Sequence, residues 1–151
     1  MNKTCPDKYI ITLIDTENVP QSCFSGLISL VEYKYGNHKN AGYYCFGIND
    51  GKSTVASGWK EQTVNLKGLT WISVNGEREK NLVDKTIIKN IKRMIDDPKY
   101  SRIDVWVIAT SDGDYEPAIQ LIRSKGHKVI VASNNTISDK LRKAGCEIYR
   151  L

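Results

Sequence analysis

The order of apolar runs and helical patterns constrains the fold most. Apolar runs rich in β-branched residues predict buried strands at residues 9–14, 41–46, 69–74, 103–109 and 129–132. Helical patterns between them predict helices from residue 22 or 25 to 34, at 80–97, at 115–125 and at 138–144. Residues 52–67 are expected to form a loop and a short helix. This alternation predicts an α/β fold on a doubly wound, mostly parallel sheet of about five strands, with helices on both faces.

Length and composition fit one soluble domain spanning residues 1–151. The chain is 40% hydrophobic and 26% charged, which is ordinary for a globular protein. Its apolar runs are far shorter than the ~20 residues of a membrane helix. The first residues do not form the pattern of a signal peptide. We therefore expect a cytoplasmic protein with no membrane partner.

The net charge and the cysteine content limit the partners and the metal sites that we expect. The formal net charge of +5 is compatible with nucleic acid as a partner. Cys5, Cys23, Cys45 and Cys146 are widely spaced, so they suggest neither a zinc site nor a disulfide framework. Neither histidine has a neighbour in the sequence that would make it a general base.

Three carboxylates follow the first and fourth predicted strands. Asp15 comes directly after the first, and Asp112 and Asp114 follow the fourth after two residues. In the strand order 3-2-1-4-5 these two strands are neighbours at the point where the order reverses. Ligands of open parallel sheets bind at that point. We therefore expect the three acids to share one crevice.

Asp84 is a fourth candidate, on the predicted helix 80–97. At 100° per residue it falls within the stripe formed by Ile87, Ile88, Ile91 and Ile95, which faces the core. A carboxylate on that side is costly unless it is paired or binds a metal. The lysines and arginine that flank this stripe are expected to form a solvated face.

Each acid also has a purely structural interpretation. Asp15 can cap a turn, the segment around Asp112 can be a turn and helix cap, and Asp84 can be a favourable acid in a first helical turn. Four acids from three segments that converge on one crevice exceed what capping requires. Oxygen ligands suit Mg²⁺ or Mn²⁺, and such a cation supports hydrolysis of phosphodiesters.

Four segments of the chain occur in an order that is typical of one family. They are Ile14-Asp15-Thr16-Glu17-Asn18, Val83-Asp84, Ser111-Asp112-Gly113-Asp114-Tyr115 with Gly126-His127-Lys128-Val129, and Ser138-x-x-Leu141. Together they resemble the D-x-x-N, V-D, S-D-G-D-F…G-x-x-V and S-x-x-L motifs of NYN domains. These are PIN-like nucleases that include the LabA-like bacterial proteins. The resemblance spans residues 11–151 and implies a PIN-like fold.

The resemblance also implies a divalent-metal ribonuclease site. Asp15, Asp84, Asp112 and Asp114 would be the catalytic and metal-binding acids. Asn18 would orient a ligand or water, although a helix-entry cap before Pro20 is an equal interpretation. Ser111 would support the turn after the fourth strand and contact substrate.

Several positions depart from the family pattern, and they leave other functions open. Lys80 stands one place before the usual basic position, and Lys89-Asn90 replace a frequent acid. A catalytically inactive module that binds RNA or protein is therefore one alternative. Asp15 and Glu17 also faintly resemble the acid pair of haloacid-dehalogenase-type phosphatases, which is a second alternative. A homodimer through a sheet edge or helix face also stays open.

RNA, single-stranded or structured, is the expected substrate, and basic side chains near the crevice are expected to contact it. Lys52 and Lys60 lie after the second strand with Trp59, which offers a surface for base stacking. Arg78 and Lys80 lead into the Asp84 helix. The function we expect is that of a Mg²⁺- or Mn²⁺-dependent ribonuclease, with endonucleolytic or exonucleolytic cleavage left open.

Overall fold

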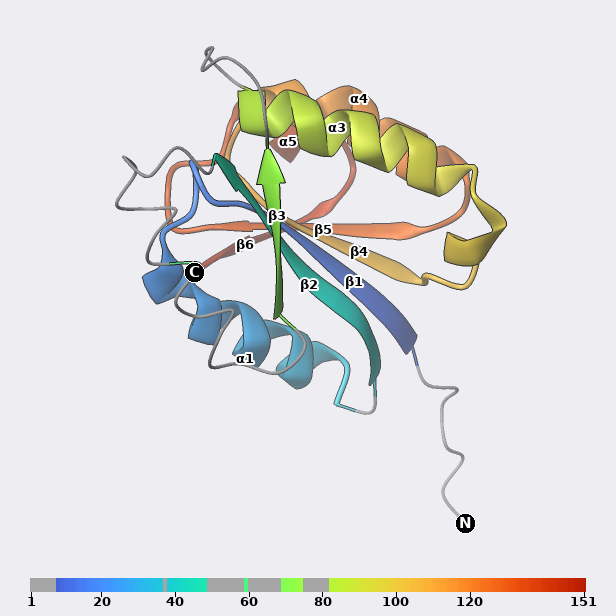
Figure 1. The fold of residues 1–151 in the computed structure, drawn as a ribbon, viewed down its shortest axis with the longest axis horizontal. Helices are drawn as coiled ribbons and strands as arrows, with labels where there is room; N and C mark the ends of the chain where they lie inside the picture. The colour runs from blue at the N-terminus through green and yellow to red at the C-terminus, as the bar shows by residue number, and fades with distance from the viewer. Residues whose placement is uncertain (1–7, 37, 49–58, 60–68, 75–81) are drawn as a thin grey trace.

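The computed structural model describes residues 8–36, 38–48, 59, 69–74 and 82–151 (Figure 1). The strands are β1 (Lys8–Asp15), β2 (His38–Ile48), β3 (Leu69–Val74), β4 (Val105–Ala109), β5 (Lys128–Ser133) and β6 (Glu147–Arg150). The α-helices are α1 (Phe24–Lys34), α3 (Leu82–Ile95), α4 (Glu116–Ser124) and α5 (Asp139–Arg142). Short 3-10 turns are η1 (Gln21–Cys23), η2 (Pro98–Tyr100) and η3 (Gly113–Tyr115). The predicted alternation of strands and helices is confirmed.

The strands form one six-stranded sheet in the order β3-β2-β1-β4-β5-β6, and every adjacent pair is parallel. The predicted order of the first five strands is therefore correct. β6 adds a sixth strand that the sequence does not predict, because four residues with no alternating pattern give no clear strand signal. The order reverses at β1, which lies between β2 and β4.

Helices cover both faces of the sheet, as Figure 1 shows, with α1 on one face and α3, α4 and α5 on the other. Successive side chains of β1 alternate between the two cores: Ile11 and Leu13 pack with α3, whereas Ile10 and Ile14 pack with α1. This burial on both faces explains why the strand sequences are continuous apolar runs.

α3 packs its apolar stripe on the sheet and brings Asp84 with it. Val83, Ile87, Ile91 and Met94 are buried, and Asp84 is 2% exposed. The helix is shorter than predicted and ends at Ile95, because Asp97 instead caps η2 by accepting a hydrogen bond from the Lys99 amide. The inward orientation of Asp84 expected from its helical position is confirmed.

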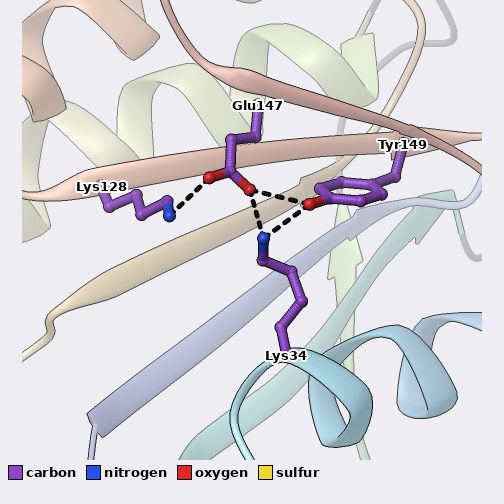
Figure 2. Close-up of polar contacts among 4 residues, drawn as sticks. All are labelled: Lys34, Lys128, Glu147 and Tyr149. Atoms are coloured by element: carbon purple, nitrogen blue, oxygen red, sulfur yellow. Dashed lines mark hydrogen bonds and ion pairs between the residues drawn. The ribbon is translucent and has the colours of Figure 1, made fainter.

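A polar network attaches the edge strand β6 to its neighbours (Figure 2). One Glu147 carboxylate oxygen is 2.7 Å from the Lys34 Nζ of α1, and the other is 2.5 Å from the Lys128 Nζ of β5. The Tyr149 hydroxyl donates to Glu147 and accepts from Lys34. The two lysines lower the pKa of Glu147 to about 2, Lys128 having the larger effect. Three elements are thereby joined at one carboxylate.

Some sequence expectations lie outside the described residues, among them all of the loop and helix at 52–67 except Trp59. Of the helices that the structure describes, none is both long enough and apolar enough to span a membrane. Cys23, Cys45 and Cys146 are free thiols.

Candidate functional site

The candidate site lies where the carboxyl ends of β1 and β4 meet the first turn of α3. β1 and β4 are paired, so Asp15 at the end of β1 lies near the turn that follows Ala109. Asp112 and Asp114 belong to that turn, and Asp84 is in the first turn of α3. The reversal of strand order at β1 places this edge where parallel sheets bind ligands.

Three of the four predicted acids come together. Carboxylate oxygens of Asp84, Asp112 and Asp114 all lie within 4.8 Å of one another, and we call these three residues the acidic cluster. Asp84 is buried, Asp112 is half-buried and Asp114 is exposed. The cluster therefore extends from the protein interior to solvent, which leaves it accessible to a substrate.

Local hydrogen bonds fix the turn that carries Asp112 and Asp114. The Asp112 carboxylate accepts a hydrogen bond of 2.9 Å from the Asp114 amide and so caps η3. The Asp112 amide donates to the Thr110 hydroxyl at 3.2 Å. The capping interpretation from the sequence is thus correct for Asp112. It is compatible with a role in binding, because capping occupies only one of the two carboxylate oxygens.

The burial of Asp84 is poorly compensated. Neither of its carboxylate oxygens has a hydrogen-bond partner in the described parts of the chain. Burial, the facing carboxyl of Asp112 and the charge of Asp15 together raise the pKa of Asp84 to about 7, and the Lys85 backbone amide opposes that rise. A buried, unpartnered carboxylate beside two others is a donor set that fits a hard divalent cation.

Asp15 lies outside the acidic cluster and is fully hydrogen-bonded. One oxygen accepts from the Glu17 amide at 3.1 Å. The other accepts from the Asn18 side chain at 2.9 Å and from the Tyr115 hydroxyl at 3.1 Å. Burial raises the pKa of Asp15, while the Asn18 and Tyr115 hydrogen bonds oppose that rise. The expectation that Asp15 binds a metal directly stays a prediction.

Asn18 and Ser111 connect the ends of the strands around the site. The Ser111 hydroxyl donates to the Asn18 side-chain oxygen at 3.3 Å, and the Asn135 side chain donates to the Asn18 carbonyl at 3.0 Å. Asn18 does not cap the following helical turn, whose N-cap is Pro20 without a side-chain hydrogen bond. The interpretation of Asn18 as a helix cap is therefore wrong, and its amide instead positions Asp15.

Trp59 does not offer the exposed stacking surface that the sequence suggested. Its side chain is 0% exposed, packs edge-on against Phe24 of α1, and donates its indole N–H to the Val19 carbonyl at 2.8 Å. The indole is part of the core on the α1 face. The other predicted substrate contacts, Lys52, Lys60, Arg78 and Lys80, lie outside the described residues.

Tyr115 is a site residue that sequence reasoning missed. Its ring is fully buried beside α4, yet its hydroxyl reaches Asp15, which is 100 positions earlier in the chain. An aromatic residue at the start of a helix is typical of a core position. Its hydrogen bond depends on the pairing of β1 with β4, so no local signal reveals it.

A solved structure of a protein of unknown function agrees with this architecture. Over 99% of this chain and 96% of the other, the fold resembles a crystal structure of a Vibrio parahaemolyticus protein of unknown function, with a TM-score of 0.70 and 14% identity. Staphylococcus aureus homoserine dehydrogenase matches with a TM-score of 0.45 and 11% identity over 96% of this chain and 33% of the enzyme. No curated protein matches the sequence. The model of the NYN domain matches residues 9–149. With its PIN-like fold and its acidic residues at the carboxyl edge of the sheet, the chain belongs to the NYN domain family of PIN-like nucleases.

Proposed function

We propose that this protein is a divalent-metal-dependent ribonuclease that hydrolyses phosphodiester bonds at the acidic cluster. The observation that carries the proposal is the buried Asp84 carboxylate, which lacks hydrogen-bond partners in the described chain and has two further carboxylates beside it. Such an arrangement is unfavourable by itself, because like charges repel and a buried carboxylate loses its hydration. Both penalties fall when a cation is bound.

Mg²⁺ or Mn²⁺ suits a site whose donors are all carboxylate oxygens. Asp84, Asp112 and Asp114 would hold the ion, and Asp15 remains a proposed further ligand. When bound, the ion stabilises the negative charge that develops on the phosphodiester.

The chain's own residues keep this arrangement in place. Asp112 uses one oxygen to cap η3, which leaves the other oxygen for a ligand. Asp15 accepts hydrogen bonds from Asn18 and Tyr115, and its negative charge acts on Asp84. Ser111, after the end of the neighbouring strand β4, holds the Asn18 side chain. Asn18 and Ser111 therefore act as positioning residues in this proposal.

RNA as the substrate rests on the family and on charge. The net charge of +5 favours a polyanion, and members of the family are nucleases. Lys52, Lys60, Arg78 and Lys80 remain proposed phosphate contacts. We place the enzyme in the cytoplasm, which agrees with the free thiols of the described cysteines. In this proposal, residues 1–151 form one catalytic domain.

The phosphatase alternative requires Asp15 to attack a phosphate. Asp15 is 1% exposed, and both of its oxygens already accept hydrogen bonds. Its surroundings therefore suit a fixed charge better than a nucleophile. The inactive binding module differs from the ribonuclease only in lacking turnover, so an assay of cleavage separates the two.

Cleavage of labelled single-stranded RNA by the full chain, with Mn²⁺, Mg²⁺ or EDTA, tests the proposal. Asp112→Asn is the informative variant, because asparagine also caps helical turns and so preserves η3 while removing one charge. We expect metal-dependent cleavage by the wild type, its loss in the variant and an unchanged circular dichroism spectrum. Absence of cleavage by folded wild type on several RNAs, or release of phosphate from p-nitrophenyl phosphate instead, would overturn the proposal.

A further inference from the structure

A hollow of about 460 Å³ adjoins the acidic cluster on the side of α4 and α5. It is lined by Gly113, Asp114, Glu116, Pro117, Lys140 and Lys143. Asp114 belongs to both the hollow and the cluster, so a ligand in the hollow lies directly beside the proposed metal site. The resemblance to the family gives no role to either lysine.

The start of α5 packs against the turn that carries Asp112 and Asp114. The Ser138 amide donates to the Ser111 carbonyl at 3.1 Å, and the Ser138 hydroxyl accepts from the Lys140 amide. A Cβ atom at Gly113 would lie 2.7 Å from the Ser138 hydroxyl and 3.2 Å from the Lys140 Cδ. The stem of Lys140 is therefore in close contact with the turn.

The charges in the hollow suit an anion. Neither lysine forms an ion pair with a carboxylate among the residues that the structure describes. Their ammonium groups are therefore available to a ligand. Once Asp114 serves as a metal ligand, Glu116 is the one acid that remains in the lining. The two lysines then outweigh it, which leaves the hollow positively charged.

We propose that Lys140 and Lys143 bind an RNA backbone phosphate next to the scissile one. This inference rests on the proposed ribonuclease function and adds a defined substrate subsite to it. Flexible ammonium groups contact phosphate without reading the bases, so the subsite contributes affinity and register rather than sequence preference. Glu116 opposes the anion and limits the affinity.

The test measures binding and cleavage of a labelled single-stranded RNA by the full chain across a range of salt concentrations. The variant Lys140→Gln/Lys143→Gln is compared with Lys89→Gln/Lys92→Gln, which removes the same charge from the exposed face of α3. Each lost phosphate contact lowers the slope of log affinity against log salt by about 0.7 for a single strand. Because Lys140 and Lys143 share one phosphate, loss of both lysines lowers the slope by about 0.7. The advantage of wild type over the variant then shrinks about 2.6-fold between 50 and 200 mM salt.

We expect the Lys140/Lys143 variant to raise KM with little change in kcat, and to keep the Mn²⁺ affinity of the wild type measured by calorimetry. Glu116→Gln should lower KM, and the α3 variant should keep the wild-type salt slope. Equal salt slopes for wild type and the Lys140/Lys143 variant, with active wild type, would overturn the subsite alone. A wild type that neither binds nor cuts RNA would overturn both the subsite and the proposed function.

Discussion

The carboxylates of Asp84 and Asp112 face each other where the first turn of α3 meets the end of β4. Burial and this contact together raise the pKa of Asp84 to about 7. A carboxylate that is charged while buried lowers the stability of the fold. Such groups are common at binding and catalytic sites. The acidic cluster thus lowers the stability of the metal-free protein and favours the binding of a metal ion.

Asp84→Asn should stabilise the metal-free protein at high pH. The unfolded chain releases the Asp84 proton near pH 3.8, whereas the folded chain holds it until about pH 7. The contribution of Asp84 to stability is therefore lost as pH rises between these values. At pH 8 in EDTA we expect the variant to exceed wild type by roughly 1–3 kcal/mol in free energy of unfolding.

Urea unfolding at pH 5 and pH 8 checks this, with Asp97→Asn as the control. Asp97 is an exposed acid that caps η2, and asparagine retains that cap. The gap between Asp84→Asn and wild type should widen from pH 5 to pH 8. A gap that does not change with pH would contradict the assigned environment of Asp84.

Tyr115→Phe should destabilise the fold while leaving cleavage metal-dependent. The substitution keeps the buried ring but removes the hydroxyl that donates to Asp15 at 3.1 Å. Loss of a hydrogen bond to a charged group costs about 1.5–3 kcal/mol. Urea unfolding measures the loss, and Tyr33→Phe, at a 90% exposed tyrosine, should show none. Equal stability of Tyr115→Phe and wild type would show that the hydroxyl contributes nothing.

Gly113→Ala and Gly26→Ala should have opposite effects. At Gly113 the new methyl group meets the Ser138 hydroxyl at 2.7 Å, so the Ser138 side chain that caps α5 must shift, at a cost of about 1–3 kcal/mol. At Gly26, in α1, it meets only Leu151 at 3.7 Å, and alanine favours the helix by roughly 0.5–1 kcal/mol. Thermal unfolding distinguishes the two, and a shift in the same direction for both would be inconsistent with the close packing of α5.

Glu147→Gln should remove part of the acid sensitivity of the protein. Lys128 and Lys34 lower the pKa of Glu147 from 4.5 to about 2, so its contribution is present above pH 4.5 and lost as pH falls toward 2. Between pH 4.5 and pH 3, the free energy of unfolding should fall more steeply for wild type than for the variant. Glu32→Gln, on the exposed side of α1, serves as the control. Parallel losses in wild type and Glu147→Gln would refute the role of the network.

The parts of the fold that local patterns specify could be predicted from the sequence. The apolar runs predicted five strands, because strands buried on both faces have a distinct composition. The order of these strands was the one expected for a doubly wound sheet. Helical periodicity placed Asp84 on the buried side of α3, where it lies. Asp112 and Asp114 follow β4 closely, so their place at the sheet edge followed from the topology.

The remaining features depend on contacts between distant segments. Asp15 lies apart from the acidic cluster because Tyr115 and Asn18 hold it, and the Tyr115 contact exists only after β1 and β4 pair. Trp59 is buried because its ring packs against Phe24 and its indole N–H donates to the Val19 carbonyl. The polar residues around Trp59 in the sequence do not indicate this burial. The hollow beside Lys140 requires the contact between α5 and Gly113.

The initial rate of RNA cleavage by metal-stripped protein, before and after addition of Mn²⁺, tests the central claim most directly. Wild type, Asp84→Asn and Asp97→Asn are compared at one RNA concentration. We predict no cleavage in EDTA, recovery with Mn²⁺ for wild type and Asp97→Asn, and a rate lower by on the order of 10²-fold or more for Asp84→Asn. Cleavage that persists in EDTA, or an Asp84→Asn variant as fast as wild type, would contradict a metal-dependent ribonuclease at the acidic cluster.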